Sequence, residues 1–172
     1  MKTILFIDDK ATIGTVLQVY LGQENNLVYV EDPLKAIDWL NQGNDPDLVI
    51  TDIRMPHMTG KEFLHYMKSN PLYSHIPVVI LSSEDSTTER IKLLEEGAAD
   101  YIVKPFNPME LKARVKKYLV QYVIYSDVKR HDLYPLRRSP YRHAAAPLCS
   151  LPRYAYPPTH LARSQPKDCR HA

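Results

Sequence analysis

Hydrophobic residues form five short runs that alternate with amphipathic stretches over the first 120 residues. The runs are rich in leucine and β-branched side chains, which is typical of strands buried on both faces of a parallel sheet. The predicted strands cover residues 3–7, 27–30, 48–51, 78–81 and 101–103. Because a helical pattern follows each strand, the chain is predicted to be an α/β fold with right-handed crossovers.

Five helices are predicted after these strands. Residues 11–22 repeat apolar side chains at helical spacing, and Asp32 followed by Pro33 supplies an N-cap and a first-turn proline for the second helix. The other helices are indicated by Phe63–Met67, Ile91–Leu94 and Leu111–Tyr122. One doubly wound domain of about 120 residues is the simplest arrangement of these elements.

Polar side chains follow four of the five strands, at the carboxyl ends where open parallel sheets bind ligands. They are Asp8 and Asp9 after the first strand, Asp52 after the third, Ser82 after the fourth and Lys104 after the fifth. Carboxylate oxygens suit Mg²⁺, and an aspartate can accept a phosphoryl group as an acyl phosphate. Three carboxylates, one Mg²⁺ and one lysine carry no net charge, so the pattern predicts a phosphoryl-transfer site.

Four segments resemble the receiver (REC) domain of two-component response regulators, of which the chemotaxis regulator is the minimal example. They are ILFIDDK at 4–10, LVITDIRMPHMTG at 48–60, PVVILSS at 77–83 and GAADYIVKPF at 97–106. The resemblance covers about residues 1–120, and we place the domain at 1–122. It implies a flavodoxin-like, doubly wound, five-stranded parallel sheet in the order 2-1-3-4-5 with five helices.

The resemblance also implies a role for each polar residue. Asp52 would accept a phosphoryl group from a sensor histidine kinase or a histidine phosphotransfer protein, and Lys104 would bind that group. Asp9 and Asp52 would ligate Mg²⁺ through their side chains and Arg54 through its backbone carbonyl. Asp8 would contribute to the metal site largely through water.

A switch pair is implied as well. Phosphorylation would draw the Ser82 hydroxyl inward, and Tyr101 would then turn from an outward to an inward rotamer. The readout would be the surface of the fourth helix, fifth strand and fifth helix, through which receivers often dimerise. Arg54 and Glu84 would tune the lifetime of the acyl phosphate, and the peptide bond before Pro105 would be cis.

The expected function is a phosphorylation-dependent signalling switch, not a metabolic enzyme, which catalyses only its own phosphorylation and dephosphorylation. One alternative is an aspartyl-nucleophile phosphohydrolase of the haloacid dehalogenase type. That family needs D-x-D after its first strand, whereas this chain has Asp8-Asp9-Lys10. A second alternative is a receiver-like binding module that acts without phosphorylation, but the complete set of acidic and basic residues argues against it.

Charge and composition separate an acidic body from a basic tail. Residues 1–120 carry 13 Lys and Arg against 17 Asp and Glu, whereas residues 121–172 carry 9 against 3. Residues 123–172 are predicted to extend the fifth helix and then to continue as a disordered, low-complexity tail rich in Pro, Arg and Tyr. Three interpretations stay open: a linker that has lost its output domain, a segment that binds nucleic acid or an acidic partner, or an out-of-frame extension.

The same composition bears on location. No apolar run approaches the ~20 residues needed to span a bilayer, and Met1-Lys2-Thr3 leads directly into a strand without a signal-peptide pattern. Both cysteines, Cys149 and Cys169, lie in the tail, so the body has no internal disulfide. We therefore expect a cytoplasmic protein without a membrane partner, whose receiver domain does not bind nucleic acid.

Overall fold

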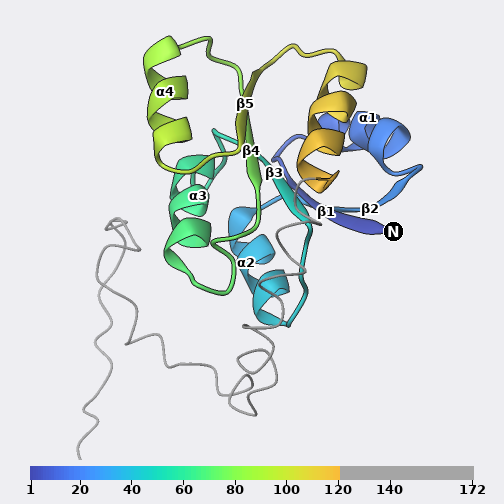
Figure 1. The fold of residues 1–172 in the computed structure, drawn as a ribbon, viewed down its shortest axis with the longest axis horizontal. Helices are drawn as coiled ribbons and strands as arrows, with labels where there is room; N and C mark the ends of the chain where they lie inside the picture. Colours follow the sequence, from blue (N-terminus) through green and yellow to red (C-terminus); the bar gives the residue numbers. More distant parts are fainter. Residues whose placement is uncertain (121–172) are drawn as a thin grey trace, which may run out of the picture. The chain divides into compact units, whose positions relative to one another are not determined.

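The computed structural model describes residues 1–120, which form a parallel five-stranded sheet with helices on both faces (Figure 1). The strands are β1 (Lys2–Ile7), β2 (Asn25–Val30), β3 (Leu48–Asp52), β4 (Val78–Ser82) and β5 (Asp100–Val103). The helices are α1 (Ala11–Leu21), α2 (Pro33–Asn41), α3 (Gly60–Ser69) and α4 (Thr87–Glu95), followed by a final helix described over residues 108–120. The strand order is β2-β1-β3-β4-β5, which confirms the predicted doubly wound topology.

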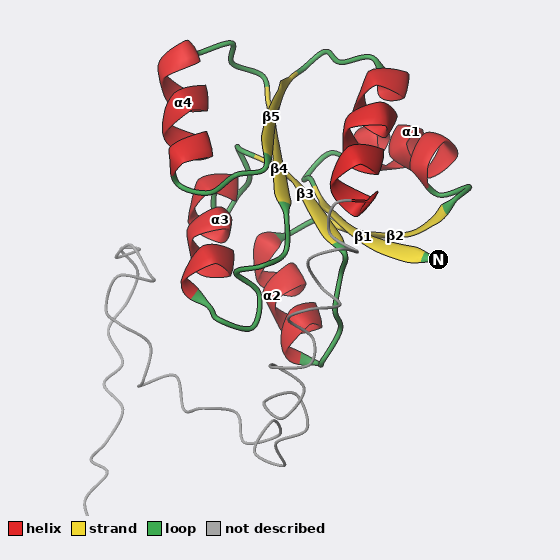
Figure 2. Ribbon diagram, in the orientation of Figure 1, coloured by secondary structure: helices red, strands yellow, loops and turns green. Residues whose placement is uncertain are grey.

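Alternate residues of each strand face opposite sides of the sheet and build two separate cores. α2, α3 and α4 cover one face, and α1 and the final helix cover the other, as Figure 2 shows. The first core includes Leu5, Ile7, Val49, Val78 and Ile80, and the second includes Ile4, Phe6, Ile50, Val79 and Leu81. Burial on both faces explains why these strands appear in the sequence as unbroken apolar runs.

The strands are longer than the hydrophobic runs that predicted them. β3 and β4 each continue one residue further, so Asp52 and Ser82 occupy the last strand positions instead of following the strand. β1, β2 and β5 begin earlier than predicted, at Lys2, Asn25 and Asp100. Lys2 pairs with Asn25 at the edge of the sheet. Backbone pairing sets the strand length there, and polar side chains at the ends do not interrupt it.

α4 forms where the sequence predicts a helix, but only part of its apolar pattern faces the core. Leu93 is buried, whereas Ile91 and Leu94 are 52% and 42% exposed. The final helix behaves differently, since Leu111, Val115 and Leu119 are all buried, as their spacing predicted. α4 therefore presents apolar side chains to solvent.

Several predictions fall on residues that are not described. The boundary at residue 122, the extension of the fifth helix and the tail at 123–172 lie outside the described range, so the three interpretations of the tail stay open. Over residues 1–120, no helix has both the length and the apolar character needed to cross a membrane.

Gly60 allows α3 to begin directly against the end of β3. Its N–H donates to the Ile53 carbonyl oxygen at 3.0 Å. A Cβ atom at this position would overlap the Asp52 carbonyl oxygen, so the close approach requires glycine. The glycine thus fixes how the strand that carries Asp52 meets the helix that follows it.

We expect Gly60→Ala to lower the free energy of unfolding by about 2–3 kcal/mol, because the added methyl group meets backbone that has little freedom to move. Urea unfolding of both proteins measures the difference. Gly14→Ala is the matched control, since its nearest neighbour is a tyrosine side chain and the change should stay within about 1 kcal/mol. Equal unfolding midpoints for Gly60→Ala and wild type would contradict the tight contact.

Candidate functional site

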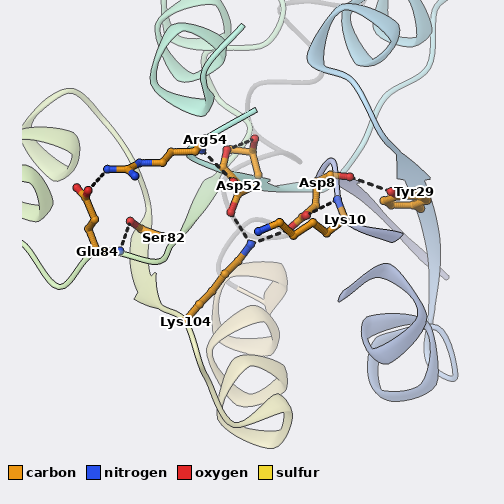
Figure 3. Close-up of polar contacts among 9 residues, drawn as sticks. Asp8, Lys10, Tyr29, Asp52, Arg54, Ser82, Glu84 and Lys104 are labelled. Carbon is orange, nitrogen blue, oxygen red and sulfur yellow. Dashed lines mark hydrogen bonds and ion pairs between the residues drawn. The ribbon is translucent and has the colours of Figure 1, made fainter. Parts of the chain in front are cut away.

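The carboxyl ends of β1, β3 and β5 bring Asp8, Asp52 and Lys104 together (Figure 3). The Lys104 ammonium donates to Asp8 Oδ2 at 2.7 Å and also contacts Asp52 Oδ1. Its backbone N–H donates to the Ser82 carbonyl oxygen at 2.7 Å, which holds the end of β5 beside β4. The peptide bond between Lys104 and Pro105 is cis, as the resemblance implied.

Each carboxylate shares its two oxygens between the lysine and a nearby backbone N–H. Asp8 Oδ1 accepts from the Lys10 N–H at 2.8 Å, and Asp52 Oδ2 accepts from the Arg54 N–H at 2.9 Å. Burial raises the pKa of the Asp8 carboxyl, and the hydrogen bond from Lys104 offsets part of that rise. One ammonium thus faces two buried carboxylates, which leaves an excess negative charge.

The donor set at this edge suits a hard cation. Asp9 is exposed beside the buried Asp8, and over residues 1–120 the side chains bring no three His, Cys, Asp or Glu into a group that could hold a metal ion. Asp8, Asp9 and Asp52 nevertheless offer carboxylate oxygens, and Arg54 offers a backbone carbonyl. Oxygen donors with unbalanced negative charge fit Mg²⁺ better than metals that prefer nitrogen or sulfur ligands.

The backbone of Glu84 connects the two residues predicted to form the switch. Ser82 is buried, and its Oγ accepts a hydrogen bond from the Glu84 N–H at 3.0 Å. The Tyr101 hydroxyl donates to the Glu84 carbonyl oxygen at 2.8 Å and lies 3.3 Å from Glu89 Oε2. Tyr101 is only 4% exposed, and this burial raises the pKa of its hydroxyl. Its side chain is therefore already turned inward, whereas the resemblance implied an outward rotamer before phosphorylation.

Arg54 and Glu84 form an ion pair between the loops that follow β3 and β4 (Figure 3). Both side chains are largely exposed, so the pair contributes little to global stability. The sequence suggested a kinetic role for each residue but did not show that they pair. The pair places opposite charges at the solvent side of the loop that follows Asp52.

Tyr29 contacts the site, and His57 lies in the loop after β3, although the sequence pattern singled out neither residue. The Tyr29 hydroxyl donates to the Asp8 carbonyl oxygen at 2.8 Å. His57, in the loop after β3, adopts a φ of 67°, and its Nδ1 lies 2.8 Å from Asp32 Oδ2. A positive φ is uncommon in residues other than glycine, and the sequence pattern did not predict one at this position.

Comparison with known proteins gives a consistent result. The family model described as the response regulator receiver domain matches residues 4–116. The chain is 32% identical to the sensor histidine kinase TmoS of Ectopseudomonas mendocina over 130 residues, and 35% identical to the regulatory protein VanR of Enterococcus faecium over 133 residues. It is also similar to the crystal structure of the Mn²⁺-bound response regulator Rcp1, with 27% identity and a TM-score of 0.59.

The matches cover different shares of this chain and of the proteins that it resembles. They cover 76% of this chain with TmoS, 75% with VanR and 68% with Rcp1. The same matches cover 13% of TmoS, 54% of VanR and 91% of the Rcp1 chain. The similarity thus spans about half of VanR, a small part of TmoS and nearly all of Rcp1.

Proposed function

The chain belongs to the response regulator receiver domain family, and we propose from this that it is a signalling switch in which Asp52 accepts a phosphoryl group. The observation that carries the proposal is the contact of Lys104 with both Asp52 and Asp8 at the carboxyl ends of the strands. A sensor histidine kinase or a histidine phosphotransfer protein would supply the phosphoryl group. The similarity to part of a sensor histidine kinase agrees with such a donor.

The proposed reaction transfers one phosphoryl group to a carboxylate oxygen of Asp52. The oxygen forms a bond to phosphorus while the bond from phosphorus to the donor breaks, and the product is an acyl phosphate. Lys104, which contacts Asp52 Oδ1, is placed to pair with the oxygens of the transferred group. Ser82, at the end of the neighbouring strand β4, would donate its hydroxyl to the same group.

Mg²⁺ is the proposed cofactor, held by the side chains of Asp9 and Asp52 and by the backbone carbonyl of Arg54, with Asp8 contributing largely through water. When bound, the ion would balance the charge that the carboxylates and the phosphoryl oxygens bring together. The chain's own contribution is to keep these oxygens at one edge of the sheet, where Asp8 and Asp52 already lie within reach of one lysine.

Phosphorylation is proposed to act through Ser82 and Tyr101. A Ser82 hydroxyl that turns to the phosphoryl group would release the Glu84 N–H, and the Tyr101 hydroxyl binds the carbonyl of that same residue. A local charge change would therefore bias the packing of Tyr101 and the adjoining surface of α4, β5 and the final helix. Ile91 and Leu94 leave part of that surface apolar, which supports a homodimer through it.

Incubation with acetyl phosphate, with and without Mg²⁺, followed by intact-mass measurement, tests the proposal. We expect one phosphoryl group per chain, gained only with Mg²⁺ and lost on treatment with hydroxylamine, which cleaves acyl phosphates. Continuous turnover of p-nitrophenyl phosphate would instead favour the phosphohydrolase alternative. A folded protein that takes up no phosphoryl group would favour a binding module that acts without phosphorylation.

A further inference from the structure

Tyr29 binds the peptide unit that joins Asp8 to Asp9. Its hydroxyl donates to the Asp8 carbonyl oxygen at 2.8 Å, and Figure 3 shows the side chain reaching this oxygen from β2. The same planar peptide unit contains the Asp9 N–H and leads to the Asp9 Cα atom. Because the unit is rigid, a bond that fixes the oxygen also fixes the direction in which the chain continues to Asp9.

The rest of Asp8 is held as firmly. Its N–H donates to the Val30 carbonyl oxygen at 3.2 Å, so neighbouring residues of β2 bind both sides of the Asp8 backbone. Its side chain is fixed by the Lys10 N–H and by Lys104. The exposed Asp9 side chain therefore depends on the Asp8–Asp9 peptide for its starting orientation.

Two neighbouring residues restrict the Tyr29 ring in the position from which its hydroxyl makes this bond. It packs against Phe6 of β1, with ring centroids 5.8 Å apart and a tilt of 34°. Gly14 of α1 also borders the ring, since an added Cβ there would come within 3.1 Å of it. Contact with a strand and a helix restricts the ring on its inner side, while Tyr29 as a whole is 37% exposed.

We propose that Tyr29 is a positioning residue of the phosphoryl-transfer site. It orients the Asp8–Asp9 peptide and thereby the acidic loop, residues 8–10 after β1, which contributes to the proposed Mg²⁺ site. The inference rests on the proposed function, since it assigns Tyr29 to the same metal site. Tyr29 acts through Asp8 and Asp9 and does not touch the reacting atoms. Groups that orient metal ligands in this way commonly alter metal affinity when they are removed.

Tyr29→Phe tests the inference, because it removes the hydroxyl and keeps the ring beside Phe6 and Gly14. We expect Mg²⁺ binding, measured by calorimetry without a phosphodonor, to weaken roughly tenfold. Phosphorylation by acetyl phosphate should slow at low Mg²⁺ and recover at saturating Mg²⁺, since the reacting groups are intact. Phosphorylation that stays slow at saturating Mg²⁺ would overturn a role confined to positioning.

Tyr118→Phe is the matched control. The Tyr118 hydroxyl donates to the Ala99 carbonyl oxygen at 2.8 Å, so the substitution removes the same kind of bond away from the acidic loop. It should leave Mg²⁺ affinity unchanged. Equal weakening in both variants would show a general effect of lost stability and would overturn the inference.

Gly14→Ala is a second variant, which keeps the hydroxyl but pushes the Tyr29 ring and favours the helix in which it lies. It should weaken Mg²⁺ binding less than Tyr29→Phe does. Wild-type affinity in both variants would refute the role of Tyr29. A wild-type protein that binds Mg²⁺ but is not phosphorylated would refute the proposed function alone, whereas one that does not bind Mg²⁺ would refute both.

Discussion

Asp52→Asn is expected to abolish the uptake of a phosphoryl group from acetyl phosphate, because an amide oxygen is a much poorer nucleophile than a carboxylate. The fold should survive the change. An asparagine Oδ1 can still accept from the Arg54 N–H or from Lys104, and the substitution removes one of two buried negative charges. Intact-mass measurement after incubation with Mg²⁺ and acetyl phosphate gives the result directly.

The control is Asp47→Asn, which removes a carboxylate that is also largely buried but lies at the opposite ends of the strands. Asp47 binds the Lys2 ammonium and the Thr3 N–H, both at 2.8 Å. This variant should lose stability and still gain one phosphoryl group. A gain that persists in Asp52→Asn would mean that another residue is the acceptor, and peptide mapping would then identify it.

The fold could be predicted from the sequence because its determinants are local. Strands buried on both faces leave unbroken apolar runs, and each run is followed by a helical pattern, so element order and class follow from spacing alone. The predicted positions of the strand ends were less accurate. Asp52 and Ser82 are polar, and yet they complete β3 and β4 because the neighbouring strands supply backbone partners.

The site could be predicted only in part, because some of its contacts depend on how separate elements pack and not on a local pattern. Asp8, Asp52 and Lys104 each lie at a strand end, and parallel strands bring those ends together without further information. The contribution of Tyr29 has no comparable pattern, since its hydroxyl meets a backbone oxygen whose position depends on how β1 and β2 align. The Arg54–Glu84 pair likewise depends on the paths of two loops, and periodicity does not describe loops.

At the helix ends, too, features with a local cause could be predicted and features that depend on distant contacts could not. The Asp32 cap of α2 follows from Asp-Pro in the sequence, and its side chain accepts from the Leu34 N–H at 2.8 Å. The capping box of α3, in which Thr59 and Glu62 bond to each other's backbone N–H, has an equally local basis in T-x-x-E. By contrast, the need for Gly60 arises from contact with a different strand, and only the assembled fold reveals it.

Lys104→Met is expected to destabilise the folded protein in the absence of a phosphoryl group. Methionine keeps an unbranched side chain and removes the charge, so the carboxylates of Asp8 and Asp52 lose the cation that they share. Breaking a buried ion pair by removing one partner typically costs about 3–5 kcal/mol. We expect a loss of about that size in the free energy of unfolding, measured by urea in the presence of a chelator.

Mg²⁺ should restore much of this loss. An ion that binds only the folded protein stabilises it in proportion to its affinity, and two unpaired carboxylates attract a divalent cation more strongly than two that share an ammonium. Mg²⁺ should therefore raise the unfolding free energy of Lys104→Met by more than it raises that of the wild type. The dependence on Mg²⁺ concentration separates this effect from a simple packing defect, which the ion would not repair.

The matched control is Lys112→Met, which breaks the pair between Lys112 and the exposed Glu24. Exposed pairs of this kind contribute little to stability, and this one lies away from the acidic loop, so neither a large loss nor a response to Mg²⁺ is expected. Equal stabilisation of both variants by Mg²⁺ would show that the ion does not replace Lys104. Agreement with the expectation would mean that the lysine and the metal neutralise the same two carboxylates, and that the lysine stabilises the site when no metal is bound.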